Sequence, residues 1–350
     1  MYSKDSVNGS AEASLTIRAA WLYYVHGLTQ AGVAEHLGIS RVKVHRLIAR
    51  AHQQNWVKVF VDGSTAEGVA LEQSLKQIFN LRFCSVVPSD IDGFVAGPDA
   101  GFRSLGAATA IYLHQYLEHH PKCSIGVGHG RTLAAVADAL PKISRPQSQF
   151  VSILGSLTRR STANPFDVIY RFAERTGGAG YFVPAPFFVD SVDDAEVLRG
   201  QRVVKSVLEL ARKTDLVLIG IGNLKNRPAI YESERRALAA LGIVGEILGQ
   251  FLDREGRTVH CDMAQRSISL RLEELRGRTV IGIAGGPDKV DAIRATLRSG
   301  LLSGLITDET TARAILEQKT PRSAAAKRAR GRKPLPPVIR SDGNRSTLGR

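Results

Sequence analysis

The chain has 350 residues, of which 43% are hydrophobic, and this is enough for about two domains with buried cores. Its net charge of +14 favours a phosphate-rich partner such as a nucleic acid. Three widely spaced cysteines without a C-x-x-C pair exclude a disulfide framework and a cysteine zinc site. No long apolar run or signal sequence is present, so we expect a soluble cytoplasmic protein that does not bind membranes.

The positive charge is concentrated at the two ends of the chain. Residues 1–63 contain seven Lys/Arg and four Asp/Glu, and residues 319–350 contain ten Lys/Arg and one Asp, whereas residues 64–318 carry a net charge of only +2. Attraction to phosphate must therefore come from the ends. Because residues 319–350 are also rich in proline and lack aromatic residues, we expect a disordered basic tail, which is either simply solvated or an accessory DNA contact.

The N-terminal part is expected to be a flexible arm followed by a helix-turn-helix. Residues 1–14 are small and polar and predict the arm, and the stretch Ile17–His26 predicts a helix that packs behind the next two. Thr29 and Ser40 are predicted N-caps of two short helices, and Gly38 lies in the turn between them. The residues predicted to face the core are Val33, Ala34, Leu37, Val44, Leu47 and Ile48.

The second of these helices presents a cationic outer face. Such a face fits the major groove, and the combination of a small residue, a turn glycine and paired aliphatic residues is typical of a DNA reader. We therefore assign residues 15–63 to a helix-turn-helix (winged-helix-like) DNA-binding domain, the alternative being an ordinary helical hairpin with a solvated basic face. The candidate DNA-binding residues are Thr29, Gln30, Ser40, Arg41, Val42, Lys43, His45 and Arg46.

The segment that follows predicts a wing strand and then a helix. Asn55–Gly63 alternates lysine with apolar residues, and Lys58 is either a phosphate contact or a solvated lysine at a strand edge. Residues 66–79 form an amphipathic helix that either caps the next domain or bridges to a dimer partner. We place the domain boundary at residue 64.

From residue 81 onward strands alternate with helices, which predicts an α/β domain over residues 64–318 with a Rossmann-like parallel sheet. Sheets of this kind bind ligands beyond the carboxyl ends of their strands. The predicted strands are Phe83–Val87, Cys123–Val127, Phe150–Leu154, Tyr181–Pro184, Leu216–Ile221, Thr279–Ala284 and Leu305–Thr307. The predicted helices are 102–119, 131–140, 165–176, 200–213, 231–241, 287–298 and 309–317.

Glycine-rich turns follow several of these strands. The turn Gly126–Thr132 leads into a helix, so its amides, the helix N-terminus and Arg131 predict a cradle for a phosphate or a sugar hydroxyl. A tight strand-to-helix turn is the alternative, and a dinucleotide site is disfavoured because Arg131 stands where G-x-G-x-x-G needs its third glycine. Glu246 and Asp253 are either acceptors for sugar hydroxyls or ordinary surface carboxylates. The candidate effector-binding residues are Gly126, Gly128, Gly130, Arg131, Thr132, Gly155, Ser156, Gly222, Glu246, Asp253, Gly285, Gly286 and Lys289.

The sequence shows no catalytic constellation. It lacks a nucleophile elbow, a Ser/His/Asp order and an H-E-x-x-H motif. His114, His119 and His120 lie before Pro121 and are interpreted as polar residues at a helix end. We therefore expect no catalytic residue, no metal and no cofactor.

The chain resembles the SorC family of bacterial sugar-responsive transcriptional regulators over about residues 15–318. The resemblance is carried by the helix-turn-helix at 29–50, by the turn Gly126–Thr132 with the following Leu133, and by the block Gly285–Arg294. Further matching stretches are Asn164–Asp167, Gly220–Gly222, Gly245–Asp253 and Thr307–Glu309.

This resemblance implies an effector domain related in fold to sugar-phosphate isomerases and deaminases, assembled as a homodimer or homotetramer. The family's phosphate-gripping loop falls on Gly126–Thr132 and its hydroxyl-binding acid on Glu246. We expect a DNA-binding repressor of a carbohydrate or polyol catabolic operon, whose effector is a sugar, a polyol such as erythritol, or a phosphorylated derivative. The alternative is an enzyme of the isomerase or deaminase type with an appended DNA-binding module, which would need a positioned acid or base.

Overall fold

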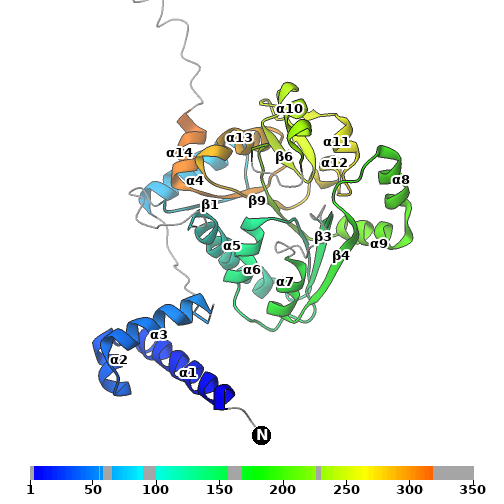
Figure 1. The fold of residues 1–350 in the computed structure, drawn as a ribbon. Helices are drawn as coiled ribbons and strands as arrows, with labels where there is room; N and C mark the ends of the chain where they lie inside the picture. Colours follow the sequence, from blue (N-terminus) through cyan, green and yellow to red (C-terminus); the bar gives the residue numbers. More distant parts are fainter. Residues whose placement is uncertain are drawn as a thin grey trace, which may run out of the picture. The chain divides into compact units, whose positions relative to one another are not determined.

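The computed structural model describes residues 4–54, 56, 57, 65–89, 100–156, 168–225 and 230–317 (Figure 1). The N-terminal helices, up to Val57, and the body, from Thr65 onward, are described separately. Most of the predicted wing strand with Lys58, the stretch Asn164–Asp167 and the basic tail lie outside the described residues.

Among the described N-terminal residues, three helices and a π-helical turn share a small core. They are α1 (Lys4–Ala20), the π-helical turn η1 (Trp21–Val25), α2 (Gln30–Leu37) and α3 (Arg41–Gln53). The core residues are Ala19, Val33, Ala34, Val44, Leu47 and Ile48, with Leu37 packed against them. The predicted inward faces of both short helices are therefore confirmed.

The first helix begins earlier than the sequence predicts. It starts at Lys4 instead of near Ile17, so residues 4–14, which were expected to form a flexible arm, are helical. The Glu12 carboxylate lies 2.6 Å from the guanidinium of Arg50 on α3, which ties the early turns of α1 to the next helix. A local pattern of small polar residues cannot reveal an ion pair with another helix.

The body is built on a parallel seven-stranded sheet with the order β1-β10-β9-β5-β2-β3-β4. All six pairings are parallel, and Ile125 in β2, for example, lies between Phe150 in β3 and Leu216 in β5. The strands are β1 (Phe83–Val87), β2 (Ser124–Val127), β3 (Gln149–Ser156), β4 (Ala179–Pro186), β5 (Leu216–Gly220), β9 (Val280–Ile283) and β10 (Gly304–Asp308). Each coincides with one of the seven predicted strands, so the predicted α/β fold is confirmed.

Between β2 and β5, the side of the sheet on which the chain adds further strands changes. From β2 the chain adds β3 and then β4 on one side, and from β5 it adds β9 and then β10 on the other. The loops after β2 and β5 therefore diverge and leave a crevice at the carboxyl ends of these two strands, which is where doubly wound sheets bind their ligands.

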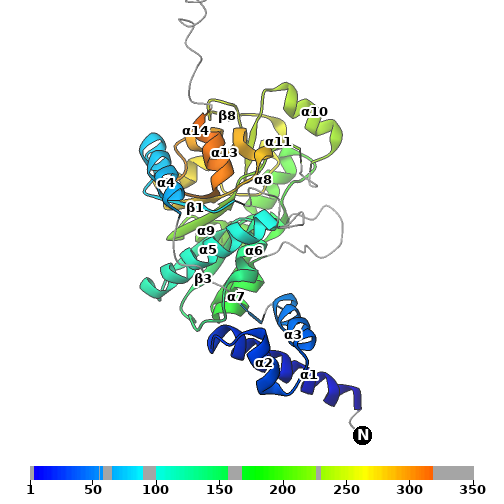
Figure 2. The same ribbon diagram turned by 90° about the vertical axis from the view of Figure 1, so that its left-hand side faces the viewer.

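Helices cover both faces of the sheet (Figure 2). One core contains Leu113, Leu133 and Phe172 from α5, α6 and α7, and the other contains Leu208 and Ile293 from α9 and α13. The helices of the body are α4 (Ala66–Phe79), α5 (Ala100–His119), α6 (Arg131–Ala139), α7 (Ile169–Thr176), α8 (Val192–Gly200), α9 (Arg202–Ala211), α10 (Glu232–Ala240), α11 (Asp262–Gln265), α12 (Leu272–Leu275), α13 (Val290–Arg298) and α14 (Glu309–Glu317), with a 3₁₀ turn, η2 (Pro287–Lys289), before α13.

The sequence analysis missed a second, antiparallel sheet. It consists of β6 (Gly245–Ile247), β7 (Gln250–Leu252) and β8 (Thr258–Val259), in that order. Strands of two or three residues are too short to show an alternating pattern. The turn between β6 and β7 has positive φ at Leu248 (54°) and Gly249 (75°), as a two-residue hairpin of type I′ requires.

Candidate functional site

The helix-turn-helix has the predicted caps and turn. Thr29 Oγ1 accepts a hydrogen bond from the Gly32 amide at 3.2 Å, and Ser40 Oγ accepts one from the Lys43 amide at 3.2 Å. Gly38 ends α2 with φ of 65°, a conformation that a residue with a Cβ adopts only at a cost. The orientation of α3 relative to α2 is therefore set by local hydrogen bonds and one glycine.

The outer face of α3 is open to solvent along its first two turns. Val44 and Leu47 point into the core, whereas the side chain of Val42 is 68% exposed in the middle of a polar face, where it could contact a thymine methyl. The exposed residues of this face are Ser40, Arg41, Val42, Lys43, His45 and Arg46; Thr29 is also exposed and Gln30 is half-buried.

A cavity lies at the crevice between the diverging strands of the body. It opens where β2, β3 and β5 end; the centre of a water-sized sphere can reach about 20 Å³ of it, and all the empty space around that, including open solvent, amounts to about 290 Å³. Its lining residues are Gly128, His129, Leu154, Phe187, Gly220, Glu246 and Leu248. Both the place and the mixture of apolar and polar groups are typical of a site for a small ligand.

Glu246 is held at this cavity by the end of β5. Its amide donates to the Gly222 carbonyl at 2.9 Å, and the Gly222 amide donates to the Glu246 carbonyl at 3.0 Å. Its side chain is only 1% exposed, and Oε1 accepts a hydrogen bond from the Gly249 amide at 2.6 Å. A buried carboxylate next to a cavity is a strong acceptor for ligand hydroxyls. Gly222, predicted to bind the effector, acts here by placing Glu246.

The Leu248 side chain reaches the cavity from a strained position. A leucine at φ of 54° is uncommon, and such outliers concentrate at functional sites. The Ser269 hydroxyl donates to the Leu248 carbonyl at 2.7 Å and thereby holds the turn. Gly249 cannot be replaced, because a Cβ there would lie 2.7 Å from Cβ of Ser267.

His129 brings a hydrogen-bonding ring to the cavity. The Ser152 hydroxyl donates its one hydrogen to the Leu154 carbonyl at 2.6 Å, so the contact of 3.0 Å between His129 Nε2 and Ser152 Oγ requires a hydrogen on Nε2. This contact fixes the orientation of the ring at the cavity.

Two predicted cations lie around one aromatic ring near the glycine loops. The Arg131 guanidinium is 4.5 Å from the centroid of the Phe102 ring, and Lys289 Nζ is 5.6 Å from the same centroid. They belong to the start of α6 and to η2, so the structure brings together two side chains suited to an anionic group, although neither is among the residues that line the cavity.

The remaining glycines among the candidates have structural roles. A Cβ on Gly126 would lie 2.9 Å from Ile153 and Thr214, and one on Gly155 would lie 2.5 Å from the Ala185 carbonyl oxygen. A Cβ on Gly285 would collide with the Asp308 carboxylate. Gly130 (φ 117°) and Gly286 (φ 104°) occupy backbone conformations that favour glycine before a helix.

Three further candidates do not line the cavity in the described part of the chain. Thr132 is 6% exposed in the first turn of α6, and Ser156 ends β3, where its carbonyl accepts from the Phe187 amide at 2.8 Å. Asp253 closes a tight turn by accepting from the Arg257 amide at 2.9 Å and from its side chain at 2.7 Å. Desolvation raises the pKa of Asp253, but these hydrogen bonds outweigh it and hold the pKa below its usual value.

The sequence analysis did not select the apolar lining of the cavity. Leu154 and Phe187 belong to β3 and to the segment after β4, and the wall behind them is the stretch 267–270. This stretch pairs Ser269 with Leu154 and Ser267 with Phe188 by single bridges. Two features of the sequence could have pointed to this lining: Gly249, which favours a left-handed turn, and His129, which lies within the glycine-rich turn.

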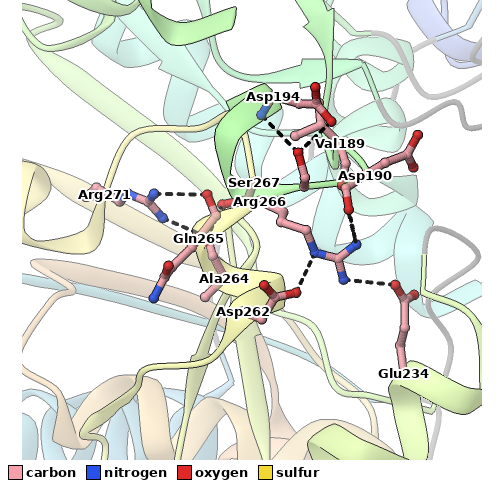
Figure 3. Close-up of polar contacts among 11 residues, drawn as sticks. Val189, Asp190, Asp194, Glu234, Asp262, Ala264, Gln265, Arg266, Ser267 and Arg271 are labelled. Atoms are coloured by element: carbon pink, nitrogen blue, oxygen red, sulfur yellow. Dashed lines mark hydrogen bonds and ion pairs between the residues drawn. The ribbon is translucent and has the colours of Figure 1, made fainter. Parts of the chain in front are cut away.

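A half-buried arginine holds this wall to two helices (Figure 3). Arg266 is 14% exposed and forms ion pairs with Glu234 of α10 at 3.1 Å and with Asp262 of α11 at 2.8 Å. Its guanidinium also donates to the carbonyls of Val189 and Asp190 at 3.4 Å. Arg266 thus joins the stretch after β4 to α10 and α11.

The histidines near Pro121 are bonded at their helix end. His119 and His120 each place Nδ1 on the carbonyl four residues earlier, at 2.7 and 2.9 Å, and His114 Nε2 lies 3.5 Å from Glu118. Among the residues that the structure describes, no group of three His, Cys, Asp or Glu side chains is placed to hold a metal ion, and no helix is long and apolar enough to cross a membrane.

Comparison with known proteins decides the family. A family model for a sugar-binding domain, named Sugar-bind, matches residues 64–317. The chain belongs to the SorC-like family of sugar-binding transcriptional regulators. It is 40% identical over 314 residues to the erythritol catabolism regulatory protein EryD of Brucella abortus, covering 88% of this chain and 98% of that protein.

Other proteins similar to this chain are also transcriptional regulators. The chain is 32% identical to the transcriptional regulator LsrR of Klebsiella pneumoniae over 87% of this chain and 94% of that one. The structure resembles the full-length sorbitol operon regulator SorC from Klebsiella pneumoniae with a TM-score of 0.68 and 27% identity, over 87% of this chain and 98% of that one. The chain is therefore a sugar-responsive transcriptional regulator, and its relatives are regulators, not enzymes.

Proposed function

We propose that this regulator represses a polyol catabolic operon and leaves its operator when erythritol, or a phosphorylated derivative, occupies the cavity. The observation that carries the proposal is the buried carboxylate of Glu246 at the ligand crevice of the sheet. A polyol is rich in hydroxyl donors for this acceptor, and a phosphate would find Arg131 and Lys289. The similarity to EryD supports a four-carbon polyol over a larger sugar.

The DNA-binding half of the proposal rests on the face Ser40–Arg46. We divide the chain into a DNA-binding domain (residues 15–63), an effector and assembly domain (residues 64–318) and two end segments (residues 1–14 and 319–350). Since residues 1–63 carry a net charge of only +3, we propose that a homodimer or homotetramer in the cytoplasm provides the DNA affinity that one copy lacks. Thr132 and the other predicted effector residues remain candidates within this proposal, except Asp253, whose side chain makes its hydrogen bonds with Arg257 inside its own turn.

Control by the effector is a population shift between two arrangements of the assembly. A ligand changes DNA binding only if it binds one arrangement more tightly than the other, and the same coupling makes operator DNA weaken the binding of the effector. Helix-turn-helix dimers read half-sites about one DNA turn apart, so a small change in the spacing of the two readers is enough to release the operator.

The test is a thermal-shift titration of the full chain with erythritol, erythritol 4-phosphate and sorbitol. A ligand at one hundred times its Kd stabilises the folded protein by about 2.7 kcal/mol, which raises Tm by a few degrees. We expect a shift with erythritol or its phosphate, together with release of an operator selected from a random duplex library.

Two glycine variants locate the binding. Gly220→Ala adds a methyl group to the cavity wall, where the nearest atom would lie 3.8 Å away, so it should fold normally and weaken the shift. Gly200→Ala adds the same group at an open position outside the cavity lining and should leave the shift unchanged. The proposal fails if no polyol or polyol phosphate shifts Tm, or if both variants respond like the unmodified chain.

A further inference from the structure

Hydrogen bonds, joined by the short backbone stretches 220–223 and 286–288, lead from the cavity to the residue at which the body begins. We propose that Glu309 is the positioning residue through which the cavity controls the DNA-reading helices, by holding Thr65 at the start of α4. The inference rests on the proposed function in one respect, because it takes the cavity as the effector site.

The first links join the cavity to the loop after β9. Gly220 lines the cavity, and Gly222, two residues later, pairs with Glu246. The next residue, Asn223, donates from Nδ2 to the Asp288 carbonyl at 2.7 Å. A movement of the cavity wall at the end of β5 therefore reaches the 3₁₀ turn that follows Gly286.

The next links cross to the end of β10. The Gly286 amide is shared between Asp308 Oδ2 at 3.1 Å and Thr311 Oγ1 at 2.7 Å. Asp308 Oδ1 accepts from the Thr311 amide at 2.8 Å and from the Ser89 hydroxyl at 3.3 Å. Asp308 therefore accepts hydrogen bonds on both carboxylate oxygens. One oxygen binds the loop after β9, and the other binds Thr311 and Ser89, which lies just after β1.

The last links reach α4. Glu309 is 5% exposed, and its Oε2 accepts from the Ser89 amide at 3.3 Å while its Oε1 accepts from the Thr65 hydroxyl at 2.5 Å. Thr65 Oγ1 in turn accepts from the Gly68 amide at 2.9 Å and so caps α4. In the sequence, residue 65 follows directly on the segment 58–64 that leads from the DNA-reading helices.

These contacts favour coupling between the cavity and α4 over a simple anchor for α4, because each hydrogen bond joins two defined groups. A carboxylate that is almost fully buried and accepts two hydrogen bonds has little freedom to find other partners, so displacement of Ser89 or Asp308 is passed on to Thr65. The exposed ion pair between Glu67 and Arg313 also joins α4 to α14, lies outside the links described above, and serves as the matched control.

The test is a double-mutant cycle read by amide hydrogen exchange in the full chain without ligand. Asn223→Ala should accelerate exchange at the first amides of α4, residues 68–70, by roughly fivefold, the effect of one lost hydrogen bond. In the Glu309→Gln background, where an amide nitrogen replaces one acceptor, the same change should have no further effect. In the Glu67→Gln background it should keep its full effect.

Rescue and cap controls separate coupling from damage to α4. Thr65→Ser keeps the hydroxyl and should behave like the unmodified chain, and Thr65→Val should behave like Glu309→Gln. Ser191→Ala removes the cap of another helix, where Ser191 Oγ accepts from the Asp194 amide, and should leave the cycle unchanged. The inference is overturned if Asn223→Ala does not alter exchange at 68–70, or if its effect survives in Glu309→Gln.

A second arm links the chain to regulation. With erythritol 4-phosphate, Glu309→Gln should give the same Tm shift as the unmodified chain but at least tenfold less operator release, whereas full release would overturn the inference. If the unmodified chain shows no shift with erythritol or its phosphate, the proposed effector is wrong, and the ligand-free exchange cycle still decides the role of Glu309.

Discussion

Glu246 is the residue on which the proposed ligand recognition depends most. Its carboxylate is buried at the cavity, and its backbone amide and carbonyl are both hydrogen-bonded to Gly222. A hydrogen bond to a charged group contributes about 1.5–3 kcal/mol. We expect Glu246→Gln to weaken binding of erythritol or its phosphate by about 10- to 100-fold, as measured by titration calorimetry.

The matched control for this change is the other predicted carboxylate. Asp253 makes its hydrogen bonds inside its own turn with Arg257, outside the cavity lining. Asp253→Asn should lower stability slightly and leave effector affinity unchanged. Equal affinities for Glu246→Gln and the unmodified chain would show that the cavity is not the binding site.

At the scale of single elements, α3 divides its residues between the core and the proposed DNA-binding face. Arg41→Ala or Arg46→Ala should each weaken operator binding by about 1–3 kcal/mol if the side chain reads a base, and should lower the salt slope by about one if it contacts phosphate. The measurement is a salt-dependent operator titration.

A control for this prediction lies on the same helix. Arg50 is paired with Glu12 of α1, so Arg50→Ala removes the same charge from α3 but loosens the packing of two helices instead of the outer face. Operator affinity that responds to Arg50→Ala as strongly as to Arg41→Ala would move the recognition surface away from Ser40–Arg46.

Sequence patterns predicted the elements of the body much better than its cavity. All seven strands of the main sheet were predictable because buried parallel strands are continuous apolar runs between helical stretches. The short hairpin β6–β7 was not, since its three-residue strands carry no period, yet it supplies Glu246 and Leu248 to the cavity. The residues alone left Glu246 open between an acceptor for sugar hydroxyls and an ordinary surface carboxylate, and only the resemblance to a family favoured the acceptor.

The polar contacts between distant elements could not be predicted from the sequence for a different reason. Arg266 with Glu234, and Glu309 with Thr65, join residues that are far apart in sequence, and charged side chains in a helix usually face solvent. Local spacing therefore predicts where helices and strands lie, whereas contacts between them depend on the tertiary structure.

At the scale of the whole molecule, buried thiols make stability depend on alkaline pH. Burial, helped by the negative charge of Glu72, raises the pKa of Cys84 from 9.0 to about 12. Because the folded state keeps its proton longer than the unfolded state, this stabilisation is complete below pH 9 and is lost as the pH rises towards about 12.

We therefore expect the free energy of unfolding to fall above pH 9, with Cys84 contributing at most about 1.4 kcal/mol per pH unit. Urea unfolding at several pH values measures it, and Cys84→Ser should flatten the curve. A slope that is identical in both proteins would mean that the Cys84 thiol does not contribute.

The pairing of β1 with β10 determines the order in which the molecule can be completed. Phe83–Val87 is the first strand of the body to be made, but its partner Gly304–Asp308 is the last. Since chains emerge from the ribosome N-terminus first, the DNA-reading helices, which have a core of their own, can fold long before the sheet closes. Regulation is thus the last property that a newly synthesised chain acquires, and a chain that stops before Gly304 would carry a DNA reader without its control.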